Sequence, residues 1–117
     1  MSLESKLFTE LGALCPRVFP DVAPAGTLRP YVTYQQIGGD PSFYVEGQVM
    51  AKVSAYMQIN VWHESRQQAN TLMRQIEAAL LQSTAFQAEP QGGLIAGFEE
   101  DTETRSAQQD FSIWADR

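Results

Sequence analysis

Apolar side chains occupy every odd position from Val49 to Val61, and mostly polar side chains occupy the positions between them. Successive side chains of a strand point to opposite faces, so this period of two predicts one long strand with a buried face and a wetter face. At about 3.3 Å per residue, this strand would be roughly 43 Å long, about twice the length of a usual strand. We therefore expect part of this strand to project from the body as an arm of a hairpin, a feature more typical of assembly than of catalysis.

The periodicity before this strand predicts a helix and a partner strand. Leucines at spacings of four, four and three, from Leu3 to Leu14, form one apolar stripe of a helix that Pro16 would end. Tyr31 to Ile37 is rich in β-branched and aromatic residues and predicts a strand that pairs with the long one as an antiparallel hairpin.

After Trp62 the apolar period becomes helical, and Ser65 followed by Gln68 has the spacing of a capping box. The buried face of this second helix is predicted to carry Ala69, Leu72, Met73, Ile76, Ala79 and Leu80. The segment from Gln87 to Gly93 is polar and is expected to be a loop. Two closing strands are expected at Leu94 to Thr102 and Ala107 to Ala115, joined near Glu103 to Ser106.

This order of elements indicates an α+β fold. We expect an antiparallel or mixed sheet of four to five strands, with two main helices packed on one face and a long projecting β-hairpin. With 117 residues, 44% of them hydrophobic, the chain fits one domain, 1–117. The single cysteine, Cys15, cannot form an internal disulfide, and it is expected to be a buried small side chain at a helix end.

Charge and hydropathy exclude several classes of function. The net charge is −6, and the basic residues are scattered singly, so sequence-independent nucleic-acid binding is not expected. No apolar run is long enough to span a bilayer, and the charged residues Glu4 and Lys6 stand where a signal peptide would need an apolar core. We therefore expect neither membrane association nor secretion by that route.

The sequence offers no recognised catalytic or cofactor motif. His63 is the only histidine; the position four residues after it is Gln67, so a zinc-protease helix lacks its second imidazole. No nucleophile elbow and no phosphate-binding glycine loop occurs, and Gly38-Gly39 and Gly92-Gly93 are better explained as turns. We predict no enzyme activity, no cofactor and no metal, and expect His63 to be solvated at the start of a helix.

The remaining candidates are surfaces for protein partners. Glu99, Glu100, Asp101 and Glu103 form an acidic run; if this run were a strand, Glu99, Asp101 and Glu103 would share a face that is solvated or turned toward a partner. A second hypothesis takes Phe43, Tyr44 and Trp114 as interface anchors, because aromatic side chains bury large areas at low entropic cost.

Several strings, in this order along nearly the whole chain, resemble the tail-completion proteins of long-tailed bacteriophages, a family that includes tail terminators and head-to-tail joining proteins. They are the leucine-rich N-terminal helix, Arg17-Val18-Phe19-Pro20, Pro30-Tyr31-Val32-Thr33-Tyr34, Gln58-Ile59-Asn60-Val61-Trp62, Gln68-Ala69 with Leu72, and Gln109-Asp110-Phe111-Ser112-Ile113-Trp114.

The resemblance implies a structural role in the tail or neck of a phage or prophage particle, after assembly in the host cytoplasm. The implied partners are further copies of the chain, commonly six in a ring, the tail-tube protein and the head connector. Two alternatives stay open. One is another neck or head-closure component; the other is a small ligand-binding or enzymatic domain that uses a sheet face with Tyr34, Tyr56 and Trp62.

Overall fold

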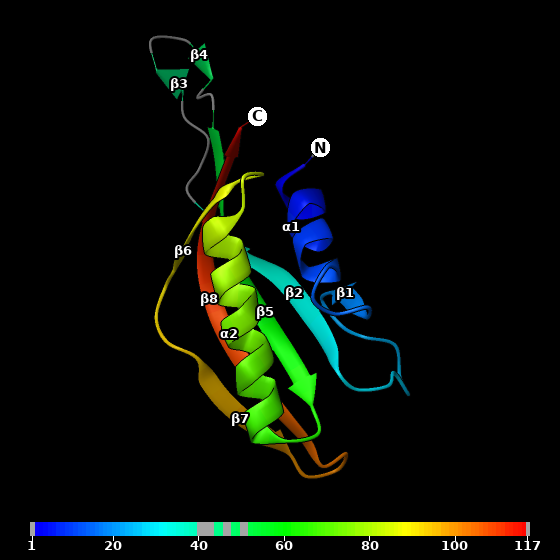
Figure 1. Ribbon diagram of the computed structural model, residues 1–117. Coiled ribbons are helices and arrows are strands. Elements are labelled where there is room, and N and C mark those ends of the chain that lie inside the picture. The colour runs from blue at the N-terminus through cyan, green and yellow to red at the C-terminus, as the bar shows by residue number, and fades with distance from the viewer. Residues whose placement is uncertain (1, 40–43, 46–47, 50–51, 117) are drawn as a thin grey trace.

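The computed structural model describes residues 2–39, 44–45, 48–49 and 52–116 of the chain. Figure 1 shows its two helices packed on one face of a single twisted sheet, with a small pair of strands beyond one end of that sheet. The elements in chain order are α1 (Leu3–Gly12), β1 (Val18–Pro20), β2 (Tyr31–Gly38), β3 (Tyr44–Val45), β4 (Gln48–Val49), β5 (Lys52–His63), α2 (Arg66–Gln82), β6 (Gln87–Pro90), β7 (Ile95–Glu99) and β8 (Thr104–Asp116).

Both helices begin where a serine can cap them. The Oγ of Ser2 accepts a hydrogen bond from the amide of Ser5 at 3.0 Å, and the Oγ of Ser65 accepts one from the amide of Gln68 at 3.2 Å. These bonds satisfy amides that have no partner within the first helical turn. Ser65 is thus confirmed as the start of α2, and the side chain of Gln68 returns to it by accepting from the Ser65 hydroxyl at 2.9 Å and not from its amide. The first helix is shorter than its leucine stripe suggested, because regular helix ends at Gly12 and the chain then turns.

The sheet has six strands in the order β1-β2-β5-β8-β6, and β7 also pairs with β8. Strand β1 runs parallel to β2, and the other pairings are antiparallel, so the sheet is mixed and open. The α+β prediction is confirmed, but the expected four to five strands were too few. The predicted loop from Gln87 to Gly93 was wrong in its first half, which is strand β6 along β8.

The central pair of the sheet is β5 and β8. Their register runs without a break from Lys52 opposite Asp116 to His63 opposite Arg105. The antiparallel pairing of β2 with β5 is also confirmed. The expected single strand from Val49 is not observed, because Val49 belongs to β4 and residues 50–51 lie outside the described part.

The part that projects is therefore not a free half of β5. It is the β3–β4 pair, which lies beyond the end of the main sheet (Figure 1). The molecule measures 53 × 26 × 23 Å, about twice as long as it is wide. We refer to the end that carries β3 and β4 as the arm end, and to the opposite end, where β7 turns into β8, as the turn end.

The core lies between the helices and one face of the sheet. On β5, Ala55, Met57, Ile59 and Val61 are buried, whereas the alternate side chains are half-exposed. Leu7 and Leu11 of α1, the predicted apolar face of α2 except half-buried Ala79, and Phe111 and Ile113 of β8 complete this core. Cys15 is buried, and its one thiol proton is within reach of the carbonyl oxygens of Arg17 and Pro30, which lie 3.5 and 3.7 Å from its Sγ atom. The period of two in the sequence thus identified the inner face of β5.

Candidate assembly surface

The sheet face opposite the helices is covered by no described helix or strand, and we call it the open face. Side chains whose backbones are paired in the register share a face. The alternate positions of β5 therefore define the open face together with their partners on β2, β8 and the outer strands. On β5 and β8 these positions are Ser54, Tyr56, Gln58, Asn60 and Trp62, and Ser106, Gln108, Asp110, Ser112 and Trp114.

An aromatic pair stands on the open face toward the turn end. The rings of Tyr31 and Trp62 are stacked, with centroids 6.0 Å apart and an interplanar angle of 19°. The indole N–H of Trp62 donates to the hydroxyl of buried Thr33 at 3.2 Å. Burial, and then the carboxylate of Glu99, raise the pKa of Tyr31 above its usual value. Tyr31 therefore remains a neutral hydroxyl donor on this face at physiological pH.

A partly buried carboxylate, that of Asp110, lies near the middle of the open face. Asp110 lines a hollow of about 200 Å³ together with Ile37, Tyr56 and Gln91. Its Oδ1 atom is inaccessible to solvent and has no hydrogen-bond partner among the described residues. The described residues thus give this oxygen no hydrogen bond in place of those it would make with water. A cation nearby would therefore stabilise the carboxylate.

The acidic run is a turn and not a strand, which corrects the expectation that Glu99, Asp101 and Glu103 share a strand face. Glu99 is the last residue of β7, and Glu100 to Glu103 form the turn into β8. The turn closes with a bond from the amide of Glu103 to the carbonyl of Glu100 at 3.3 Å, and Glu103 has a left-handed φ of 52°. Because all four carboxylate residues are exposed, an acidic surface is present at the turn end.

Arg29 ties this turn to the loop before β2. Its Nη1 atom lies 3.2 Å from the carbonyl oxygens of both Thr102 and Glu103, and 3.3 Å from the hydroxyl of Thr104. The loop and the turn enclose a hollow of about 430 Å³ that Tyr31 and Glu99 also line. The sequence alone did not indicate this contact, because it joins residues more than 70 positions apart.

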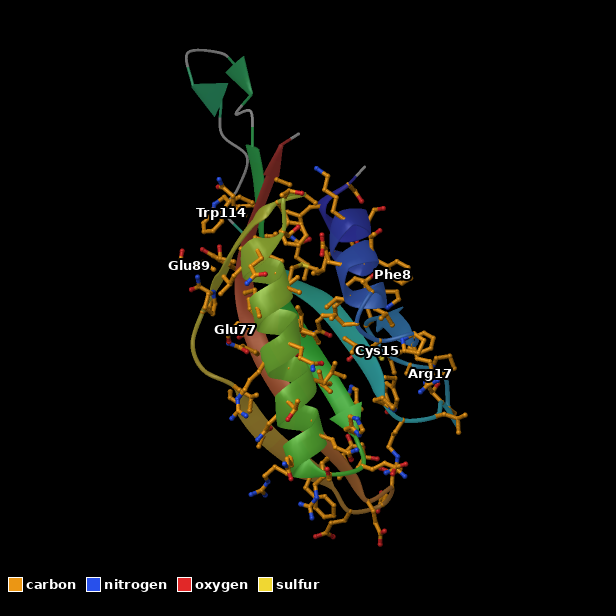
Figure 2. The ribbon with its side chains drawn as sticks, viewed as in Figure 1. Phe8, Cys15, Arg17, Glu77, Glu89 and Trp114 are labelled. Carbon is orange, nitrogen blue, oxygen red and sulfur yellow. The ribbon has the colours of Figure 1, made fainter. Side chains whose placement is uncertain are left out.

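The predicted interface residues fall at opposite ends of the molecule. Trp114 is half-buried on the open face at the arm end (Figure 2), and Tyr44 belongs to β3 beyond that end. The acidic turn precedes β8, about 33 Å from Trp114 at 3.3 Å per residue. Phe43 lies outside the described residues. The structure therefore does not bring the aromatic and acidic candidates into one patch.

The hypothetical ligand site with Tyr34, Tyr56 and Trp62 is wrong in one member. Tyr34 pairs with Ile59, so it points toward the helices, and its ring lies 6.4 Å from that of Phe8 on α1. Tyr56 and Trp62 are on the open face. The three aromatic side chains cannot line one site, because the sheet separates Tyr34 from the other two.

His63 was expected to be solvated at the start of a helix, but it is half-buried at the end of β5. Its Nδ1 accepts the amide of Glu64 at 2.9 Å, so this nitrogen is an acceptor in a local turn. Burial lowers its pKa, the carboxylate of Glu64 opposes that shift, and Arg29 adds to it. Among the residues that the structure describes, no serine or cysteine side chain is hydrogen-bonded to the imidazole. The geometry thus shows a structural contact.

Within residues 2–39, 44–45, 48–49 and 52–116, no three His, Cys, Asp or Glu side chains gather as a metal site requires. No helix there is both long enough and apolar enough to cross a membrane.

A buried polar contact fixes the connection between β6 and β7. The Nε2 of Gln109, which is 3% exposed, donates to the carboxylate of Glu77 on α2 at 2.8 Å and to the carbonyl of Gly92 at 3.1 Å. Glu77 thereby points toward the sheet (Figure 2). The outer surface of α2 consequently has no exposed acidic side chain between Arg66 and Gln82.

Both the sequence and the fold are similar to those of known proteins. The sequence model of the family described as "Tail completion protein gp17" matches residues 6–116. Among solved structures, the fold is similar to a chain of the "Virion of native gene transfer agent (GTA) particle", with a TM-score of 0.63 and 15% identity over 99% of this chain and 96% of that chain. No curated protein matches the sequence significantly. The chain therefore belongs to the tail completion protein gp17 family and is a structural protein of a phage-type particle, in its tail or neck.

Proposed function

We propose that the protein caps the head-proximal end of the tail tube as a ring of identical copies and joins the tube to the head connector. The observation that carries this proposal is the family match over residues 6–116, nearly the whole chain. The resemblance drawn from the sequence implied six copies in the ring. The protein would assemble in the host cytoplasm and act without catalysis, through its surfaces alone.

Three structural features support an assembly role. The molecule is elongated, its β3–β4 pair extends beyond the sheet, and a full face of the sheet is left open. An element that extends beyond the compact body can reach a neighbouring subunit in a ring, and an open face can be covered by one. The similar chain in the gene transfer agent particle also comes from an assembled virion.

The acidic turn has a proposed place in this ring. Six copies of a chain with a net charge of −6 carry −36, and an acidic inner wall would repel DNA as it passes. We expect Glu99, Glu100, Asp101 and Glu103 to line the channel or to contact the neighbouring subunit. A ring structure with these residues on its outer rim would refute this placement.

The experiment is electron microscopy of particles made after deletion of the gene, with a plasmid copy as the control. Filled heads beside unjoined tails of abnormal or irregular length are expected, and the plasmid copy should restore joined particles. Normal infectious particles from the deletion strain would reject the proposal. Filled heads with normal tails that merely fail to join would indicate the other neck or head-closure role instead.

A further inference from the structure

The open face and the outer surface of α2 carry opposite charges. Glu89 of β6, Glu99 of β7 and Asp110 of β8 lie at open-face positions, and the acidic turn adjoins them at the turn end. Lys52 and Asp116 are paired in the backbone register at the arm end, one basic residue and one acidic residue. Arg29 lies at the turn end, where carbonyl oxygens bind its guanidinium. The open face is therefore acidic over most of its length.

The outer surface of α2 is basic and rich in amides. Arg74 is exposed on it. Arg66 is exposed at the first turn of the helix, about 80° around the axis from Arg74, and Glu77, the single acid of the helix, is bound by Gln109 on the inner side. Figure 1 shows this surface of α2 turned away from the sheet. Its other exposed side chains include Gln67, Gln75 and Leu81, the last 48% exposed.

We infer that the outer surface of α2 of one copy docks on the open face of the next copy. This inference rests on the proposed ring, and it names the contact between its subunits. A helix layer on the open face would cover both faces of the sheet, which is a common stable arrangement of layers. The contact joins unlike surfaces, and a front-to-back contact of this kind closes into a ring when its rotation allows.

The spacing of the charges fits this contact. Arg66 and Arg74 are eight residues apart on a helix, about 12 Å at 1.5 Å per residue. Glu89 is opposite Ser112, two residues from Asp110 on the neighbouring strand, so the two acids are about 8 Å apart. Long arginine side chains bridge a difference of this size. They would also place a cation close to Asp110, whose Oδ1 atom has no hydrogen-bond partner among the described residues.

Complementary surfaces of this kind are individually small. The 17 residues of α2 make a helix about 25 Å long, so the contact belongs with the weaker protein interfaces. Several copies held together at a tail end would associate through their high effective concentration. Assembly must therefore be measured both in solution at high concentration and on tails.

The test uses two double variants with opposite charge changes. One is Arg66→Glu with Arg74→Glu, and the other is Glu89→Arg with Asp110→Arg. Each alone places like charges across the contact, so self-association should weaken at least tenfold. A mixture of the two restores opposite charges at every contact of an alternating ring with an even number of copies, and association should return to within about threefold of the wild type. Lys6→Glu and Glu4→Lys on α1 are the control variants.

Self-association of the purified proteins is measured by sedimentation. Capping of tails is measured by electron microscopy of the deletion strain, in which each variant is expressed alone or both are expressed together. If Asp110→Arg fails to fold, as judged by circular dichroism, Gln108→Arg replaces it. Unchanged association of both double variants, or no recovery in their mixture, would overturn the inference and leave the ring itself intact. If the wild type neither self-associates nor caps tails, the proposed function fails as well.

Discussion

Arg29 should stabilise the turn end of the protein, and this can be measured with the substitution Arg29→Met. Methionine keeps most of the aliphatic stem and removes the guanidinium. The Nη1 atom has two hydrogens, so at most two of its three acceptors, the carbonyls of Thr102 and Glu103 and the hydroxyl of Thr104, are bound at once. Buried charged hydrogen bonds contribute about 1.5–3 kcal/mol each, but Thr102 and Glu103 are exposed and water can replace the arginine there. We expect Arg29→Met to lower the free energy of unfolding by about 1–2 kcal/mol in total.

Urea denaturation followed by tryptophan fluorescence and circular dichroism gives this free energy. A loss of this size should lower the Tm by about 4–8 °C for a domain of this length. The matched control is Arg74→Met on the exposed outer surface of α2, which should change the stability by less than about 0.5 kcal/mol. An equal loss in both variants, or no loss in Arg29→Met, would refute the assignment of Arg29 as the clamp of the turn.

Two further predictions concern the core and the histidine. Phe111→Ala removes a fully buried ring between β8 and the helices, so it should cost about 3–5 kcal/mol in urea denaturation; a cost below about 1 kcal/mol would contradict the described core. Burial lowers the pKa of His63 in the folded state, so the unfolded chain binds more protons near pH 6.5, and stability should fall as the pH drops through that region. His63→Asn keeps an acceptor for the amide of Glu64 but has no titrating group. Its loss of stability between pH 8 and pH 5 should therefore be smaller than that of the wild type. An equal or larger loss would refute the lowered pKa of His63.

The sequence predicted the elements whose signals are local. The alternation along β5 identified its buried face, and the Ser65 capping box identified the start of α2, because both depend on residues a few positions apart. Strand β6 escaped prediction because Gln87 to Pro90 is polar and ends in proline. An edge strand tolerates both features, since one of its sides makes no ladder bonds.

The site required information that the sequence does not contain locally. The ligand-site alternative assigned Tyr34 and Trp62 to one sheet face, but the face of a residue on β2 depends on its register with β5. The acidic run was expected on a strand, whereas the register of β7 with β8 ends the strand at Glu99. The Arg29 clamp and the Gln109 bond to Glu77 likewise depend on contacts between distant segments.

The sequence indicated the open face only through the polar side chains that alternate with the buried ones along β5. Its extent across the sheet follows from the pairing of β2, β5 and β8 and from the fact that both helices pack on the other side (Figure 1). Its acidity follows from Glu89 and Asp110, which are 21 positions apart and become neighbours through the pairing of β6 with β8.

The most direct test of the central claim is a cryo-electron microscopy reconstruction of the neck of particles that contain this protein. The proposed function predicts a closed ring of copies of this fold between the end of the tail tube and the head connector. A tube end occupied by another protein, with this chain elsewhere in the particle or absent from it, would contradict the claim.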